Sequence, residues 1–150
     1  MLTIDFKSVS LGGQYSPRNV GAVWVETGSG TFVKTLERWA GIRVNHLSRW
    51  NTASGGWGGI FGGGNTADMM DAVSRATLRS HEMHRATWNM KDSKGQVIPD
   101  GMYNVVVELA DDGRRASMFG TVAFMKGSAP QMVTAPDKAP WSGLTLNYQP

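Results

Sequence analysis

The sequence predicts a mostly β protein, a β-sandwich of about seven strands with short helical insertions and a glycine-rich loop. Short runs of β-branched and aromatic residues, bounded by Gly, Pro, Asn or Asp, recur along most of the chain. The length of 150 residues suits one domain, residues 1–150, with its own hydrophobic core. These observations favour two packed sheets over a helical fold.

Seven runs have the length and composition of strands. They are Leu2–Phe6, Val20–Glu26, Thr31–Leu36, Arg85–Met90, Met102–Ala110, Ser117–Met125 and Leu144–Tyr148. Turn residues separate them: Thr27–Gly30 follows the second run, while Pro99–Gly101 and Asp111–Gly113 flank the fifth. The regular return of turns is typical of a sandwich.

Two segments between the third and fourth strands are expected to be helical insertions. Gly41–Trp50 carries apolar residues at roughly helical spacing, and Ala67–Leu78 is the second segment. Between them, seven of the eleven residues of Ser54–Gly64 are glycine, which opposes regular structure. We expect a flexible loop there, because the segment lacks the Lys-Ser/Thr ending of a phosphate-binding P-loop.

The composition excludes several classes of function. The formal net charge is +3, but Lys and Arg are scattered, so a nucleic-acid partner is not expected. Without cysteine there is no disulfide, Cys zinc site or thiol nucleophile. No apolar run approaches the roughly 18 residues of a membrane span. The first residues do not form a signal peptide, so for an exported protein we expect Met1 to replace a removed signal.

The most specific motif lies at Asp71–Ser80. It resembles the D-x-x-S-G-A-T sequence at which bacterial FAD:protein FMN transferases attach FMN, as in the covalent-flavin subunits of sodium-translocating NADH:quinone oxidoreductase. The residues on matching motif positions are Asp71, Ser74, Ala76 and Thr77. The resemblance implies that Thr77 carries FMN as a phosphoester. Arg75 stands where the motif usually has glycine.

The transferase would supply the base and metal that an unactivated threonine hydroxyl needs, so the chain itself requires no catalytic triad. Arg75, Arg79 and His81 are candidates to neutralise the phosphate, although on a solvated face they would have no specific role. Trp57 is a candidate for contact with the flavin, as are Trp50 and Trp141. Trp24, Trp39 and Trp88 are expected in the core.

A second resemblance covers nearly the whole chain. It rests on Val23–Glu26, Phe32–Trp39, Asp71–Thr77, Thr87–Met90, Asp92–Gly95 and Val97–Tyr103. These stretches look like a bacterial family of predicted periplasmic proteins of unknown function. Its members resemble the immunoglobulin-like domain of the flagellar hook-capping protein and are associated with flavin transferases and PepSY-type membrane proteins. The resemblance implies an immunoglobulin-like sandwich, a periplasmic or other extracytoplasmic location and a membrane redox partner.

These observations lead to the hypothesis of an extracytoplasmic electron-transfer carrier with covalent FMN, rather than a stand-alone enzyme. Two alternatives stay open. The first is a carbohydrate-binding or adhesion sandwich without redox chemistry, because the six tryptophans are potential aromatic platforms. The second is a periplasmic copper protein with His81, Met83 and His84 as ligands, although most methionines are expected to pack inside the strands.

Overall fold

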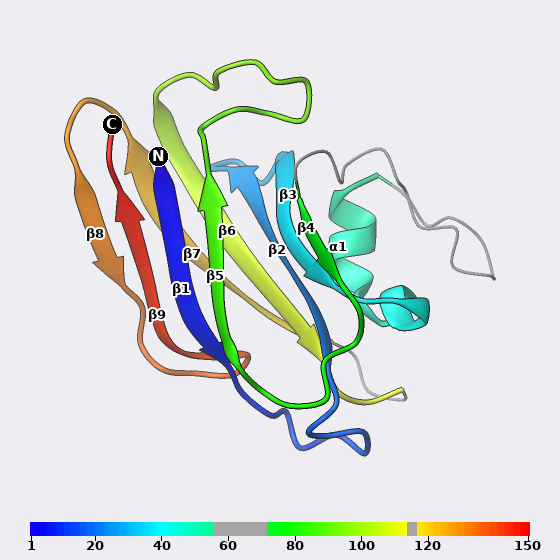
Figure 1. The fold of residues 1–150 in the computed structure, drawn as a ribbon. Helices are drawn as coiled ribbons and strands as arrows, with labels where there is room; N and C mark the ends of the chain where they lie inside the picture. Colours follow the sequence, from blue (N-terminus) through cyan, green and yellow to red (C-terminus); the bar gives the residue numbers. More distant parts are fainter. Residues whose placement is uncertain (56–71, 114–116) are drawn as a thin grey trace.

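The computed structural model describes residues 1–55, 72–113 and 117–150. Trp57, Asp71 and most of the glycine-rich segment therefore lie outside the described residues. The described residues form two sheets that pack face to face, with the chain ends side by side at one end of the sandwich (Figure 1). The prediction of a β-sandwich is confirmed.

The first sheet has four antiparallel strands. In order across the sheet they are β5 (Met83–Trp88), β1 (Leu2–Ser8), β9 (Trp141–Tyr148) and β8 (Gln131–Thr134). The second sheet contains β4 (Val73–Arg75), β3 (Phe32–Trp39), β2 (Val20–Thr27), β6 (Gly101–Ala110) and β7 (Met118–Lys126). Its strands are antiparallel except for the parallel pair of β3 and β4.

Alternation along the strands builds the core between the sheets. In β5, His84, Ala86 and Trp88 are buried, whereas the residues between them are exposed, as the two-residue period of a strand requires. The ring of Trp88 meets those of Tyr103 and Phe124 edge-on, an arrangement that aromatic quadrupoles favour. The aromatic side chains of both sheets therefore interlock in one core.

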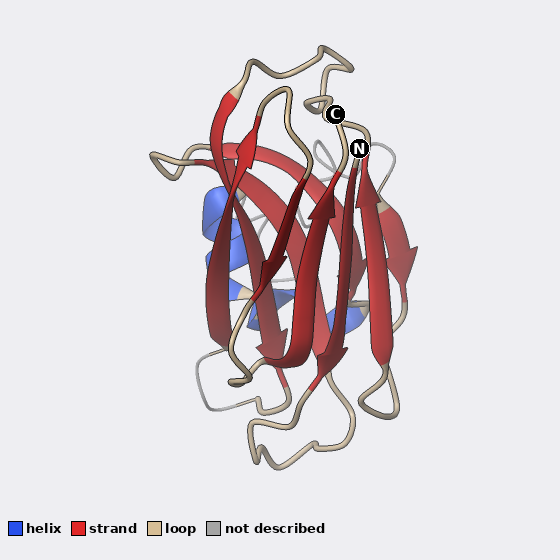
Figure 2. Ribbon diagram, turned by 90° about the vertical axis from the view of Figure 1, so that its left-hand side faces the viewer, coloured by secondary structure: helices blue, strands red, loops and turns tan. Residues whose placement is uncertain are grey.

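A second apolar layer covers the outer face of the five-stranded sheet. It contains η1 (Ile42–His46) and α1 (Ser48–Ala53), which lie behind the strands in Figure 2. The Glu108 carboxylate accepts backbone N–H bonds from Arg49 and Trp50 at 3.0 and 2.7 Å. Glu108 thus satisfies amide groups that the start of a helix leaves without partners, and it anchors α1 to the sheet.

The seven predicted strands are all present, with small shifts at their ends, and the helical prediction for Gly41–Trp50 corresponds to η1 and α1. The helix predicted at Ala67–Leu78 is wrong over its described part, because Val73–Arg75 pairs with β3 as a strand. The prediction missed this strand and β8.

The predicted positions of two tryptophans and of the methionines are also wrong. Trp50 and Trp141 are fully buried instead of available to a ligand. Trp50 donates its Nε1–H to Thr35 under the second layer, and Trp141 packs where a Cβ at Gly120 would collide with its ring. Trp24, Trp39 and Trp88 are buried as predicted. The large exposed methionines are Met1, Met83, Met102, Met118, Met125 and Met132.

Candidate functional site

The segment that carries the flavin-attachment motif crosses one end of the sandwich between β4 and β5. Arg75 ends β4, and its guanidinium pairs with Glu37 of β3 and with Glu82, 2.8 Å away. Further along, Leu78 and Asn19 exchange two backbone hydrogen bonds of 3.0 and 3.1 Å. The chain around Thr77 is therefore fastened on both sides.

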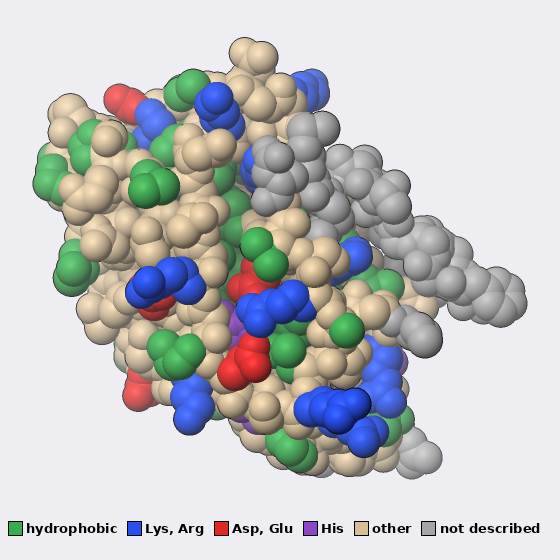
Figure 3. Space-filling view, viewed as in Figure 1, with side chains coloured by type: hydrophobic (Ala, Val, Ile, Leu, Met, Phe, Trp, Pro, Cys, Tyr) green, Lys and Arg blue, Asp and Glu red, His purple; other side chains and the backbone are tan. Residues whose placement is uncertain are grey.

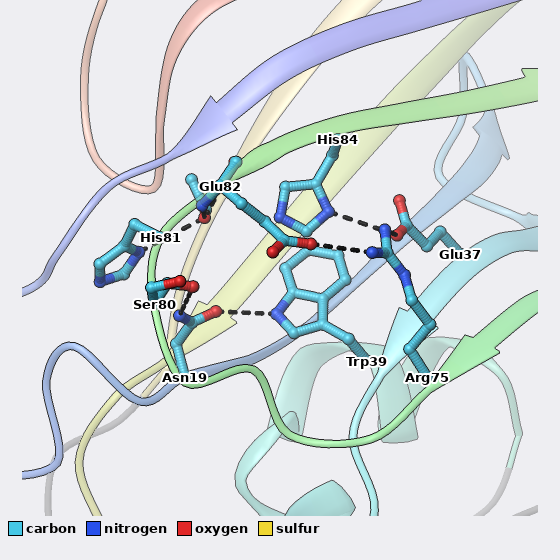
Figure 4. Close-up of polar contacts among 9 residues, drawn as sticks. Asn19, Glu37, Trp39, Arg75, Ser80, His81, Glu82 and His84 are labelled. Atoms are coloured by element: carbon cyan, nitrogen blue, oxygen red, sulfur yellow. Dashed lines mark hydrogen bonds and ion pairs between the residues drawn. The ribbon is translucent and has the colours of Figure 1, made fainter.

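Asn19 is the main fastening point. This buried side chain donates to the carbonyl oxygens of Pro17 and Ser80 at 3.0 and 3.2 Å. Its Oδ1 accepts the indole N–H of Trp39 at 2.8 Å. Figure 4 shows Asn19 between Trp39 and Ser80. Together with the backbone pairing of Asn19 with Leu78, these bonds fix the segment that connects β4 of one sheet to β5 of the other.

Thr77 lies at the wall of a cavity of about 490 Å³. The cavity is lined by Arg18, Gly41 and Arg43 from outside the motif and by residues 76–79 from within it. Thr77 is half-buried, and among the described residues its hydroxyl forms no hydrogen bond. The volume falls within the range of about 300–1,000 Å³ that is typical of small-molecule sites. The site combines a hydroxyl group with room for a ligand of nucleotide size.

The charged residues of the described ranges that line the cavity are all arginines. Arg18, Arg43 and Arg79 line it, and none of them forms an ion pair with a carboxylate in the described part of the chain. The guanidinium of Arg43 lies over the ring of Tyr15, 4.3 Å from its centroid. Lys and Arg side chains gather at this end of the molecule in Figure 3. Guanidinium groups without carboxylate partners can form charge-assisted, often bidentate, hydrogen bonds to a phosphate.

A buried polar cluster lies beside this segment. The ring of His84 stacks on that of Phe6, with centroids 4.8 Å apart, and lies tilted against that of Trp39, with centroids 4.1 Å apart. Its Nδ1 lies 3.3 Å from Glu37 Oε1 (Figure 4). Burial raises the pKa of Glu37, but bonds and attraction from His84 and Arg75 outweigh it, and the pKa is lowered. The cluster keeps a carboxylate ionised inside the fold.

Only some of the predicted cofactor-binding residues line the cavity. Ala76, Thr77 and Arg79 line the cavity. Arg75 is held by two carboxylates instead, and the half-buried His81 has its Nδ1 3.4 Å from the Ser8 hydroxyl. Burial lowers the pKa of His81, against the charge of Asp111. Ser74 is an exposed residue of β4, and Asp71 and Trp57 lie outside the described residues.

The copper alternative fails on geometry. Met83 and His84 are neighbours on β5, so their side chains project to opposite faces of the sheet. Met83 is exposed, whereas His84 is enclosed by Phe6, Trp39 and Glu37. The described residues also contain no group of three His, Asp or Glu side chains arranged to hold a metal ion. His81, Met83 and His84 therefore do not form one metal site.

Sequence reasoning missed Arg18, Arg43 and Tyr15. Arg18 belongs to the connection between β1 and β2, and Arg43 belongs to η1, both far from Thr77 along the chain. Their approach depends on the pairing of Asn19 with Leu78 and on the position of η1. No motif or spacing in the sequence carried that information.

The fold and the site define a β-sandwich domain with an open cationic cavity at one end. The chain belongs to the family described as predicted periplasmic protein (DUF2271), whose model matches residues 8–138. This description agrees with the expected periplasmic location. No curated protein and no solved structure matches the chain. None of the helices in the described ranges has the length and apolar character to cross a membrane.

Proposed function

We propose that the protein is a periplasmic electron-transfer carrier with FMN bound covalently to Thr77. The observation that carries this proposal is the position of Thr77. The threonine that matches the flavin-acceptor position of the motif lies at a cavity lined by three arginines, none of which pairs with a carboxylate of the described residues. A fully buried Thr77 would not accommodate a phosphoester.

The residues around Thr77 fit the group. Thr77 Oγ would form a bond to the FMN phosphorus of FAD as the pyrophosphate bond breaks, with AMP as leaving group and the threonine proton passing to a base of the transferase. No described residue hydrogen-bonds the Thr77 hydroxyl, which agrees with activation by an outside enzyme. The arginines would then neutralise the remaining phosphate charge.

FMN, when bound, supplies reversible transfer of one or two electrons. The protein would contribute the attachment point, the surrounding charge and a fixed location. A covalent bond suits a periplasmic carrier because it prevents loss of the cofactor by diffusion and keeps its local concentration high. The expected partners are the FAD:protein FMN transferase and a membrane redox protein of PepSY type.

Neither alternative function has a supporting observation. The five tryptophans among the described residues are all buried, so none of them offers an aromatic platform to a sugar. The copper ligands do not converge. The flavin hypothesis therefore has the support of both the motif and the cavity.

The test is co-expression with the transferase in the periplasm, followed by intact mass and visible absorbance. Wild type should be yellow and heavier by one FMN less one water. Thr77→Ala should remain colourless, whereas Thr87→Ala, at an exposed threonine on β5, should be modified like wild type. An unmodified wild type beside a transferase control that is active on another substrate would refute the proposal.

A further inference from the structure

The arginines of the Thr77 cavity differ from most other arginines of the described residues in having no carboxylate partner there. Arg49 pairs with Glu26 at 3.0 Å, Arg85 pairs with Asp5 at 2.6 Å, and Arg75 has two carboxylates. Arg38 lies over the ring of Trp50. The remaining arginines of the described ranges all line one cavity and have no carboxylate partner there: Arg18, Arg43 and Arg79.

The backbone places two of these arginines at facing positions. In an antiparallel bridge, the residue before one partner faces the residue after the other. The bridge of Asn19 with Leu78 therefore sets Arg18 opposite Arg79. Like charges at facing positions destabilise a strand pair. The buried hydrogen bonds of Asn19 keep these two positions facing each other.

The third charge is oriented by an aromatic ring. Arg43 comes from η1, and its guanidinium lies over Tyr15. Tyr15 lines a narrower recess that adjoins the cavity and shares Arg18, Arg43 and Thr77 with it. Asp111 and Asp112 also line this recess. Asp111 Oδ2 is engaged within the fold, because it accepts the N–H of Leu11 at 2.8 Å. Neither aspartate lines the larger cavity.

We propose that this cavity is a preformed phosphate site, which binds a phosphate monoester non-covalently before any bond to Thr77 exists. Three cations that repel one another are relieved by an anion, and guanidinium groups bind phosphate oxygens in pairs of hydrogen bonds. The protein itself would thus select the phosphate end of the flavin nucleotide. The assignment of the ester as FMN rests on the proposed function, whereas the anion site rests on the arginines alone.

The experiment is a titration of wild-type protein, produced without the transferase, with FMN, riboflavin and inorganic phosphate, followed by calorimetry. FMN should bind at least about tenfold more tightly than riboflavin, which lacks the phosphate, because charge-assisted hydrogen bonds are lost. Inorganic phosphate should compete with FMN. Higher ionic strength should weaken binding.

Three matched variants locate the site. Arg18→Gln and Arg43→Gln should each weaken FMN binding by about tenfold, since each removes one charged donor. Arg85→Gln removes the same charge from the outer face of β5 and should bind FMN like wild type. Circular dichroism verifies that all three variants fold.

Equal binding of FMN and riboflavin would overturn the phosphate site, as would equal effects of Arg18→Gln and Arg85→Gln. Flavin attachment to Thr77 without FMN binding by the unmodified protein would refute this inference and leave the proposed function intact. Binding of phosphate that depends on Arg18 and Arg43, without attachment by an active transferase, would support the anion site and refute the proposed function.

Discussion

Arg75 and Arg79 lie four residues apart on the same segment, yet their surroundings are opposite. Arg75 is paired with Glu37 and Glu82 and ties β4 to the interior of the sandwich. Arg79 faces a cavity with Arg18 and Arg43 and has no carboxylate partner among the described residues. Paired charges here hold the chain in place, whereas unpaired charges remain available to a ligand. Thr77 lies between the two regions.

The largest expected effect comes from breaking the paired region. Glu37→Ala removes the carboxylate from buried His84 and from Arg75, and we expect it to lower the free energy of unfolding by roughly 3 kcal/mol, the low end for a buried pair because Arg75 is partly exposed. Arg79→Ala should change it by no more than about 0.5 kcal/mol. Urea denaturation measures both variants. Equal losses would contradict the distinction between the regions.

Asn19 links the two regions, so Asn19→Ala should affect both stability and modification. It leaves the buried indole N–H of Trp39 without its acceptor and releases Ser80, for an expected loss of about 2 kcal/mol. Attachment of FMN by the transferase should also slow, because Thr77 is less well positioned. The matched control is Asn104→Ala, which removes one bond of 3.3 Å to Thr27. If Asn19→Ala behaved like this control, Asn19 would not be a fastening point.

Two buried carboxyl groups sharpen the comparison through opposite pH dependence. The pKa of Glu37 is lowered from its ordinary value of 4.5, so its contribution to stability is present above that pH and is lost as the pH falls through the folded value. Burial raises the pKa of Glu108, despite bonds from Ser117 and the start of α1. The contribution of Glu108 is therefore present at acid pH and is lost as the pH rises through the folded value.

The measurement is the free energy of unfolding from about pH 3 to pH 7 for wild type, Glu37→Gln and Glu108→Gln. The advantage of wild type over Glu37→Gln should shrink toward acid pH. Relative to Glu108→Gln, wild type should lose stability as the pH rises. Parallel curves for the three proteins would show that neither carboxyl group is perturbed.

The smallest effect is expected from the exposed pair of Arg85 and Asp5. The side chain of Arg85 is 72% exposed, so its ion pair is screened by water. Arg85→Ala should therefore leave the free energy of unfolding close to that of wild type. Urea denaturation of Arg85→Ala and Glu37→Ala under the same conditions compares the two losses of stability. Equal losses would contradict the importance assigned to burial.

Sequence patterns predicted the strands whose residues alternate or are bounded by turn residues, because these features depend only on neighbours along the chain. The alternation of β5, which has one buried face, and the turns around β6 identify these strands. β4 and β8 escaped prediction because three and four residues are too short for a period to show. Burial of Trp50 also could not be predicted, since it requires the second apolar layer on the outer face of the sheet.

In the site, too, the sequence predicted the residues of the local motif but not those that come from remote segments. The local motif predicted Thr77, and residues 76–79 do line a cavity. Arg18 and Arg43 come from remote segments, and only the folded chain brings them to Thr77. The pairing of Arg75 with Glu37 likewise depends on the parallel contact of β3 with β4. Whether Asp71 and Trp57 contact a flavin stays a prediction.

The most direct test of the account is peptide mapping of protein modified by the transferase. Trypsin cleaves after Arg75 and Arg79, and the released peptide 76–79 contains a single hydroxyl side chain, that of Thr77. Tandem mass spectrometry should find FMN, less one water, on this peptide and on no other. FMN on the peptide with Ser74, on the one with Ser80, or on neither would contradict the assignment of Thr77 as the flavin acceptor.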